Sequence, residues 1–303
     1  MTLEYALLDV FADAPFQGTQ IPVVNSAGRV LDEATRKAIA SEFQQTETVF
    51  IEPESAVPAS VYNSRGPQRF GAHTILAASF MAYELGLSKA EGSFASFVLQ
   101  QETGLIESFI DNSDSNDGKP GNIQFARVLS PTFDRYTPEL AGLAAALNTE
   151  EKHIAFSKYK PMVVSVDRPT LIVPFTRPEH VIAASLNQER WTELLGDVYT
   201  SELFLFAPGS ITGGTEFHGR LVNPNLPKDA YPPIGNVMPE FIAYLAEQAE
   251  TAPGTHTFSV DRGSADSRKS ILHAEFDKKP GREVRCRIGG NVIKMGEGKL
   301  LYA

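Results

Sequence analysis

Two ionisable side chains each stand where an apolar stretch begins. Glu47 lies in TETVF (residues 46–50), at the start of a short apolar strand, and His73 opens the long apolar segment 73–86. An ionisable group beside apolar residues is costly unless it is paired or used. A carboxylate and an imidazole together can take up and return a proton without a metal. We interpret Glu47 and His73 as an acid/base pair; the alternatives are a solvated strand-edge carboxylate and a capping or packed histidine.

The sequence lacks the patterns that are typical of other chemistries. It contains no HExxH and no CxxC, which are zinc-binding spacings, and no GxGxxG or P-loop for a nucleotide. Cys286 is the single cysteine, which excludes an intrachain disulfide and a thiolate metal cluster. The sequence therefore predicts a site without a metal or an organic cofactor.

Length and charge narrow the class of protein. At 303 residues the chain exceeds the usual size of one domain, which favours two. The net charge of −10 and the pI near 5.2 argue against nucleic acid or an anionic membrane as a partner. No apolar run approaches the ~18 residues of a membrane span. Glu4 and Asp9 interrupt the first apolar stretch, which argues against a signal peptide. We expect a cytoplasmic protein that acts on a small molecule.

Apolar periodicity predicts the same loose order of elements in both halves: strands, a loop and then one apolar helix. The first half is predicted to contain strand 3–12, helix 31–44, strands 48–51 and 60–63, and helix 73–86. The second half is predicted to contain strand 170–175, helix 188–197, strands 203–206 and 217–222, a Pro-rich loop at 223–234, and helix 237–249.

The starts of the two apolar helices are the expected ligand-binding ends. Asn236 suits the N-cap of the second apolar helix. Two helices that are wrapped by strands, with their N-termini facing one cleft, would favour an anionic ligand group. Near the C-terminus we expect two strands joined by a turn at 289–291, and a further turn around Gly296 and Gly298.

Five stretches, in the right order, resemble the phenazine-biosynthesis isomerase (PhzF-like) family, which has the diaminopimelate-epimerase fold. The resemblance covers nearly the whole chain. It rests on DVFADAPFQG (9–18), TETVF (46–50), FGAH (70–73), FHGR (217–220), and the closing GGNV (289–292) and GEGKL (296–300).

The resemblance implies an α+β fold of two pseudo-symmetric halves, each a strand layer curled around a central helix. The first half would comprise residues 1–128, joined by the C-terminal strands near 288–303, and the second would comprise 129–287. The active site would lie in the cleft between the halves and need no cofactor. A homodimer is the assembly that the resemblance implies.

The resemblance also implies roles for single residues. In the family's isomerases a glutamate moves a proton on a small cyclic, amino-acid-derived carboxylic acid; by position that glutamate is Glu47. The histidine that follows the family's glycine is His73, the second implied catalytic residue. The implied substrate contacts are Thr19, Gly71, Ala72, His218, Tyr231, Gly235 and Asn236.

The segment before the second apolar helix departs from the family pattern. The family has E-D-P-x-T-G-S-A there, whereas this chain has AYPPIGNV (230–237). Tyr231 stands at the family's aspartate and Asn236 at its serine. Asp229 lies two positions from Tyr231 and is a candidate to replace that aspartate.

The expected function is that of a cofactor-independent isomerase, or a cyclase, of a small cyclic or amino-acid-derived metabolite. Glu47 would act as general acid and base. The alternative is a PhzF-like protein that binds a small molecule but has altered or lost its chemistry. The changed 230–237 segment favours this alternative, whereas the presence of Glu47 and His73 opposes it.

Overall fold

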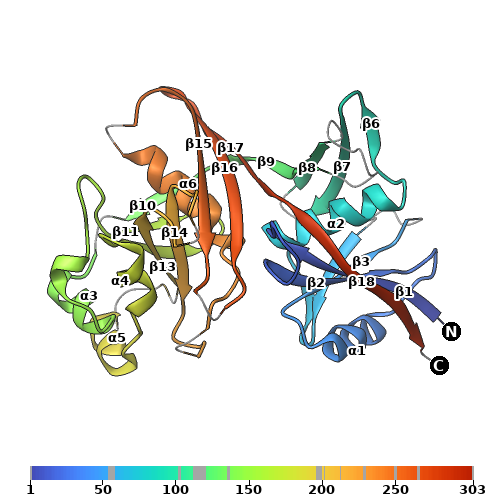
Figure 1. Cartoon of the computed structure of the whole chain (residues 1–303), viewed down its shortest axis with the longest axis horizontal. Coiled ribbons are helices and arrows are strands. Elements are labelled where there is room, and N and C mark those ends of the chain that lie inside the picture. The colour runs from blue at the N-terminus through green and yellow to red at the C-terminus, as the bar shows by residue number, and fades with distance from the viewer. Residues whose placement is uncertain are drawn as a thin grey trace. The chain divides into compact units, whose positions relative to one another are not determined.

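The chain forms two compact units. The computed structural model describes residues 2–53, 59–101, 104–111, 121–134, 137–195, 200, 202–211, 213–227, 230–248, 251–264 and 267–301. Unit 1 comprises Met1–Arg127 with Arg287–Ala303, and unit 2 comprises Val128–Cys286 (Figure 1). The chain leaves unit 1 within β9 (Ile123–Leu129) and returns to it within β17 (Val284–Gly290).

Unit 1 contains a six-stranded sheet in the order β18-β1-β2-β3-β4-β5. Its strands are β1 (Thr2–Val10), β2 (Thr19–Asn25), β3 (Thr48–Ile51), β4 (Ala59–Asn63), β5 (Gly66–Gln68) and β18 (Val292–Leu301). β2 and β3 are parallel, which requires a crossover between them; α1 (Glu33–Phe43) provides it. α1 begins at the N-cap Asp32, whose side chain accepts a hydrogen bond from the N–H of Thr35. It covers one face of this sheet, where Ile39 packs in one cluster with Phe50 and Tyr62.

The central helix of unit 1 is α2 (Ala72–Glu84). Its residues 72–82 are all buried, as expected of a helix that is apolar around most of its surface. α2 contacts β2 and β3 as well as β7 (Phe94–Gln101) and β8 (Gly104–Asp111). These last two strands form an antiparallel ladder with β6 (Lys89–Glu91) and β9. A 2.7 Å hydrogen bond between the hydroxyls of Ser79 and Ser108 joins α2 to β8.

Unit 2 has the strand order β10-β11-β12-β13-β14-β15-β16, with the parallel pairs β12–β13 and β14–β15. The strands are β10 (Thr132–Asp134), β11 (Met162–Ser165), β12 (Pro169–Pro174), β13 (Glu202–Pro208), β14 (Phe217–Val222), β15 (Gly254–Arg262) and β16 (Ser270–Lys278). The central helix α6 (Met238–Glu247) packs Phe241 against Phe204, Phe206 and Phe217.

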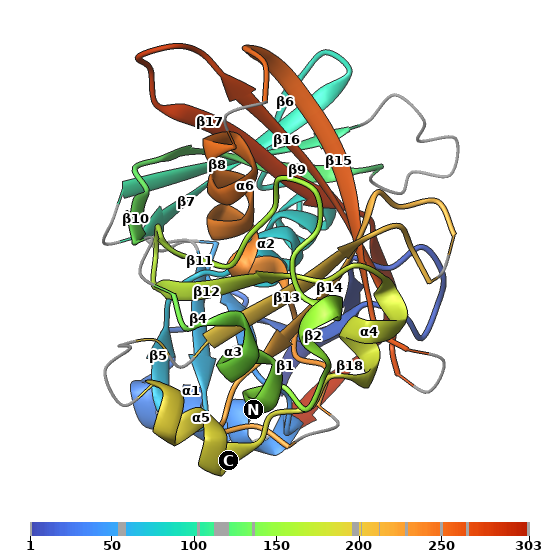
Figure 2. The same cartoon turned by 90° about the vertical axis from the view of Figure 1, so that its left-hand side faces the viewer.

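Three short helices lie on the other face of these strands. They are α3 (Leu140–Ala146), α4 (Pro178–Ala183) and α5 (Gln188–Leu195), and a single turn of 3-10 helix, η1 (Glu151–His153), follows α3 (Figure 2). Their side chains, Trp191 among them, form one buried cluster with Leu203 and Leu205 of β13. The sheet of unit 2 is therefore covered on both faces: Leu203 and Leu205 face α3–α5, whereas Phe204 and Phe206 face α6.

The expected α+β architecture, with strands curled around one central helix in each half, is confirmed. The long apolar helix predicted at 73–86 is α2, and Gly86, which follows it, adopts the positive φ of +69° that terminates helices. The helix predicted at 237–249 is α6. The helix predicted at 188–197 is α5, and residues 196 and 197 lie outside the described residues.

Three local predictions are wrong. Asn236 is not an N-cap: it lies inside the 3-10 turn η2 (Gly235–Val237), and α6 begins after Val237, without a side-chain cap. Gly296 and Gly298 form no turn but lie within β18, opposite β1, and a Cβ at Gly298 would approach the Tyr5 ring to 2.8 Å. The two strands predicted on either side of residues 289–291 are present as β17 and β18, but the turn between them forms no hairpin, because β17 and β18 belong to different sheets. The carbonyl of Asn291 instead accepts hydrogen bonds from the N–H groups of residues 11 and 12.

Candidate active site

Glu47 and His73 are in direct contact within unit 1. Glu47 directly precedes β3, in which Phe50 faces α1; alternation along the strand therefore turns Glu47 toward the opposite face, where α2 lies. His73 is the second residue of α2. Its Nε2 lies 2.6 Å from Oε2 of Glu47, and the side chains are 2% and 13% exposed, respectively. The structure thus brings together the two residues that the sequence predicts to be catalytic.

The start of α2 is built so that His73 points at the carboxylate. Gly71 is the N-cap, in an extended conformation, and its N–H donates to the hydroxyl of Thr74 at 2.9 Å. The first helical residue, Ala72, is buried and small. The first turn of a helix carries partial positive charge, which stabilises a nearby carboxylate. Gly71 and Ala72 therefore belong to the backbone that surrounds this pair.

Only one nitrogen of His73 and one oxygen of Glu47 take part in the contact between them. When His73 carries its proton on Nε2, it donates to Glu47, and Nδ1 is then a buried acceptor with no partner among the described residues. A hydrogen bond to a carboxylate at this distance is short and strong. Oε1 of Glu47 makes no hydrogen bond within the described part of the chain. One carboxylate oxygen is therefore held by the imidazole, and the other is available to a ligand.

Thr19 stands at the start of β2, also in unit 1. It pairs with Val10 of β1 and is half-buried. Gly18 before it has a φ of +70°, and a Cβ there would come within 2.3 Å of the carbonyl oxygen of Val10. Only glycine fits this approach, so the turn that leads to Thr19 is fixed by the backbone.

His218 lies in the interior of unit 2. It is fully buried in β14, opposite Ala207, and therefore on the face of the sheet that α3–α5 cover. Its Nδ1 lies 2.7 Å from Oδ1 of Asp261 in β15, and the hydroxyl of Ser210 donates to Oδ2 of the same carboxylate at 2.7 Å. The substrate contact expected of His218 stays a prediction. Sequence reasoning missed Asp261, because only the parallel pairing of β14 with β15 brings it opposite His218.

Tyr231 is held by two buried arginines of unit 2. The guanidinium of Arg220 lies 4.6 Å from the centre of the Tyr231 ring and also donates to the carbonyls of Ile182 and Ala184 at the end of α4. Arg262 donates to the carbonyl of Tyr231, and burial lowers the pKa of Arg262 to about 10, with a smaller contribution from Arg268. The Tyr231 hydroxyl makes no hydrogen bond among the described residues. These two contacts hold the ring and the backbone of Tyr231 against β14 and β15.

Two further predicted contacts, Gly235 and Asn236, form η2, which follows Tyr231 and precedes α6. Gly235 is buried and Asn236 is half-buried. Asp229, the candidate replacement for the family's aspartate, lies outside the described residues. That the residues around α6 and those around α2 contact one ligand stays a prediction.

A small pocket in unit 2 has neither Glu47 nor His73 among its lining residues. Its volume is about 30 Å³, and it is lined by Arg220, Asn223, Ala230 and neighbouring residues of β14 and the Pro-rich loop. That volume holds a water molecule or two but no metabolite. The assignment of the site therefore rests on the paired side chains and not on this pocket.

The described residues contain no group of three or more His, Cys, Asp or Glu side chains that is arranged to hold a metal ion. Within the same ranges, no helix is both long and apolar enough to span a membrane.

Comparison with known proteins relates nearly the whole chain to one family. Residues 8–298 match the family model PhzC-PhzF, described as phenazine biosynthesis-like protein. A protein of Mesorhizobium japonicum named as an uncharacterized isomerase is 23% identical over 306 residues, which cover 99% of each chain.

Solved structures show the same fold at low identity. The PhzF-family phenazine biosynthesis protein of Bacillus anthracis superposes with a TM-score of 0.82, at 17% identity and 100% coverage of both chains. A hydroxyproline epimerase of Agrobacterium vitis, solved with trans-4-hydroxy-L-proline bound, gives a TM-score of 0.58 at 11% identity, over 99% of this chain and 92% of that one.

Proposed function

The chain belongs to the phenazine biosynthesis-like (PhzC-PhzF) family, and from this premise we propose that it is a cofactor-independent isomerase of a small cyclic, amino-acid-derived carboxylic acid. Glu47 takes a proton from the substrate and returns it to another position of the same molecule. The observation that carries the proposal is the 2.6 Å contact between Glu47 and the buried His73 at the start of α2.

The geometry suits a proton shuttle. His73 holds Oε2, so the carboxylate has one orientation, and Oε1 is the atom that meets the substrate. A well-placed general acid or base contributes about 10²–10⁴-fold in rate. The same group can act as base and then as acid, because the carboxylic acid that forms when it removes a proton returns a proton in the next step, after exchange with solvent. Such an isomerisation balances without an oxidant or a second reactant.

Two solved structures with the same fold support a cyclic amino-acid substrate. The Agrobacterium vitis epimerase was solved with a cyclic amino acid bound, and a further neighbour, with a TM-score of 0.60 at 10% identity, is described as a probable proline racemase of Agrobacterium radiobacter. Cyclic amino acids of this kind are therefore the first compounds to test, and the exchange of a carbon-bound proton with solvent is the reaction to follow.

The test is solvent deuterium incorporation, followed by NMR, with wild-type protein and two variants in D₂O. The ligands are L-proline, trans-4-hydroxy-L-proline and their unsaturated ring analogues. Glu47→Gln keeps the shape of the side chain but cannot accept the proton. We expect it to lose exchange by at least about 10²-fold. Glu42→Gln, an exposed change on α1, is the matched control and is expected to exchange as wild type does.

Exchange by Glu47→Gln within about tenfold of wild type would refute the proposed role. The competing function, binding without chemistry, has one observation in its favour: Tyr231 stands where the family has an aspartate. It predicts a different result, namely ligand binding by the wild type without proton exchange in any of these compounds.

A further inference from the structure

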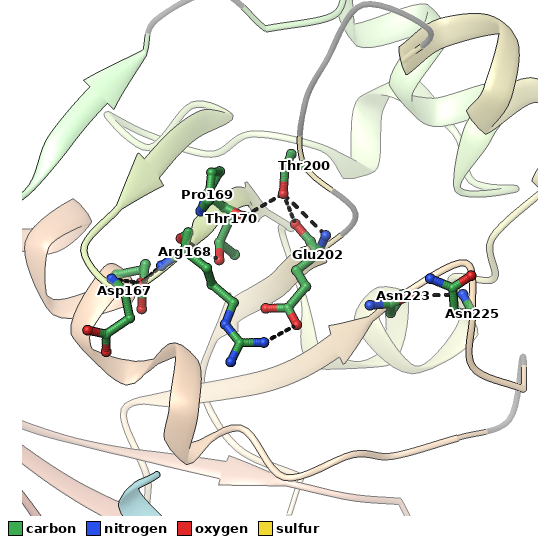
Figure 3. Close-up of polar contacts among 9 residues, drawn as sticks. Asp167, Arg168, Pro169, Thr170, Thr200, Glu202, Asn223 and Asn225 are labelled. Atoms are coloured by element: carbon green, nitrogen blue, oxygen red, sulfur yellow. Dashed lines mark hydrogen bonds and ion pairs between the residues drawn. The ribbon is translucent and has the colours of Figure 1, made fainter. Parts of the chain in front are cut away.

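Unit 2 contains an ion pair at the start of its own parallel strand pair. Nη1 of Arg168, in the turn between β11 and β12, lies 2.9 Å from Oε1 of Glu202, the first residue of β13 (Figure 3). The Arg168 side chain is 55% exposed and that of Glu202 is 17% exposed. Exposed pairs of this kind contribute little to stability, so stability alone is a weak reason for this arrangement.

Glu202 occupies in unit 2 the position that Glu47 occupies in unit 1. The residue after Glu47 pairs with Tyr62, the last residue but one of β4; the residue after Glu202 pairs with Val222, the last residue of β14. An asparagine follows each of these partner residues, Asn63 after Tyr62 and Asn223 after Val222. In both units a glutamate therefore stands directly before the first of these cross-strand pairs, and an asparagine follows the partner residue.

The parallel partners extend this match. Val49 of β3 and Phe204 of β13 are equivalent in this match. Thr19 and Arg168 precede the parallel partners of these two residues, in β2 and β12, by the same number of residues and are therefore equivalent too. Thr19 is one of the substrate contacts that the family resemblance implies. Arg168 is therefore the counterpart in unit 2 of a predicted binding residue in unit 1.

The two glutamates also face the same way within their units. Glu47 faces the central helix α2, which the contact with His73 shows. Along β13, Leu203 faces α3–α5 and Phe204 contacts Phe241 of α6, so alternation turns Glu202 to the α6 face. Each unit therefore presents a carboxylate on the face of its central helix.

The backbone that carries Arg168 is fixed by a buried carboxylate. Oε1 of Glu240, in the first turn of α6, accepts hydrogen bonds from the N–H groups of Val166, Asp167 and Arg168 at 3.3, 2.8 and 3.2 Å. Glu240 is fully buried, and burial raises its pKa. A buried carboxylate is costly, and here it fixes a turn whose exposed side chain is an arginine.

Glu202 is fixed as firmly. The hydroxyl of Thr200 accepts from the N–H of Glu202 and donates to the carbonyl of Pro169, which ties the starts of β13 and β12 together (Figure 3). A guanidinium that is exposed and a carboxylate that is partly buried are thus held side by side on hydrogen-bonded backbone. Such preorganised groups bind a ligand without an ordering cost of their own.

We propose that Arg168 and Glu202 recognise a zwitterion: Arg168 binds the carboxylate of an amino-acid-type ligand, and Glu202 binds its ammonium group. When the ligand binds, the ion pair between Arg168 and Glu202 is replaced by two ion pairs between the protein and the ligand. This inference rests on the proposed function for its ligand class and adds to it the residues that select for both charges.

Calorimetric titration with three small ring compounds tests the assignment. L-proline carries both charges, L-prolinamide carries only the positive one, and cyclopentanecarboxylate carries only the negative one. Wild-type protein is expected to bind L-proline about tenfold more tightly than either of the others, the contribution of one charge-assisted hydrogen bond.

The variants Arg168→Gln and Glu202→Gln should lose this discrimination in opposite ways. Arg168→Gln is expected to bind L-proline no more tightly than L-prolinamide, and Glu202→Gln to bind it no more tightly than cyclopentanecarboxylate. The matched control is Arg190→Gln, which breaks an exposed arginine–glutamate pair of 3.0 Å on α5 and should keep the wild-type preference. A purely structural ion pair would not give this reciprocal pattern.

Three results would overturn the assignment: no binding of L-proline by the wild type, no preference for L-proline over both probes, or a preference that survives both substitutions. Glu47→Gln separates this test from that of the proposed function, because it should keep the charge discrimination while it loses proton exchange. Discrimination without any exchange in the wild type would refute the isomerase proposal and leave this binding element standing.

Discussion

Replacement of His218 by alanine should destabilise unit 2 rather than merely weaken ligand binding. His218 and Asp261 are both fully buried and lie 2.7 Å apart. Removing one partner of a buried pair leaves the other charge uncompensated, which costs about 3–5 kcal/mol. Asp261 keeps the hydrogen bond from the Ser210 hydroxyl, so we expect the lower end, about 3 kcal/mol. For a unit of this size, that corresponds to a fall in Tm of roughly 6–12 °C.

The chain offers a local probe for this experiment. Trp191 is the single tryptophan and is buried in the α3–α5 cluster of unit 2, so its fluorescence in urea reports on the unit that contains His218. Ser210→Ala should cost about 2 kcal/mol, because its hydroxyl donates to Asp261 and also accepts from the N–H of Gly213, and each hydrogen bond has a net value of about 1 kcal/mol. His273→Ala, an exposed change on β16, is the control. A loss below about 1 kcal/mol for His218→Ala would refute the interior role, and weaker ligand binding at unchanged stability would restore the predicted substrate contact.

His73→Ala removes the hydrogen bond that orients Oε2 of Glu47. It should lower kcat about 10–100-fold with a smaller change in KM, measured by steady-state exchange kinetics. Burial raises the pKa of Glu240 above its unfolded value, so the folded state resists its ionisation, and stability should fall as pH rises from the unfolded pKa through the folded one. Urea titrations between pH 4 and 8 should show this slope in the wild type and its loss in Glu240→Gln; an unchanged slope would contradict the assignment. We also expect a homodimer, and light scattering that gives a monomer mass at micromolar concentration would contradict this.

Sequence reasoning recovers the elements whose signal is local. The helix α2 is apolar on every side, and such a segment is stable only when it is surrounded, so its position and burial follow from composition. The strands of the parallel pairs are short continuous apolar runs for the same reason. Glu47 and His73 stand out because each lies at the beginning of such a run, and the contact between them follows once β3 and α2 are neighbours.

The features that sequence reasoning missed depend on pairing between distant segments. Gly296 and Gly298 read as turn residues, yet they lie in a strand, because the partner strand places the Tyr5 ring over one of them. Asn236 reads as an N-cap, yet the chain makes a 3-10 turn first and buries Val237 at the helix start. Local sequence preference indicates which residue types suit a turn or an N-cap. Contacts with distant segments decide whether the turn or the cap forms.

The correspondence between Glu47 and Glu202 also depends on pairing between distant segments. Identity between the halves is too low for an alignment to show it, and the two glutamates contact different partners, a histidine in one unit and an arginine in the other. What they share is register: Glu47 directly precedes β3, Glu202 is the first residue of β13, and each faces the central helix of its unit. A register is visible only when the strands are paired. The divergence of the partners has a chemical sense, because a histidine suits the movement of a proton, whereas an arginine stays charged and suits the binding of an anion. The same register position can therefore supply chemistry in one unit and recognition in the other.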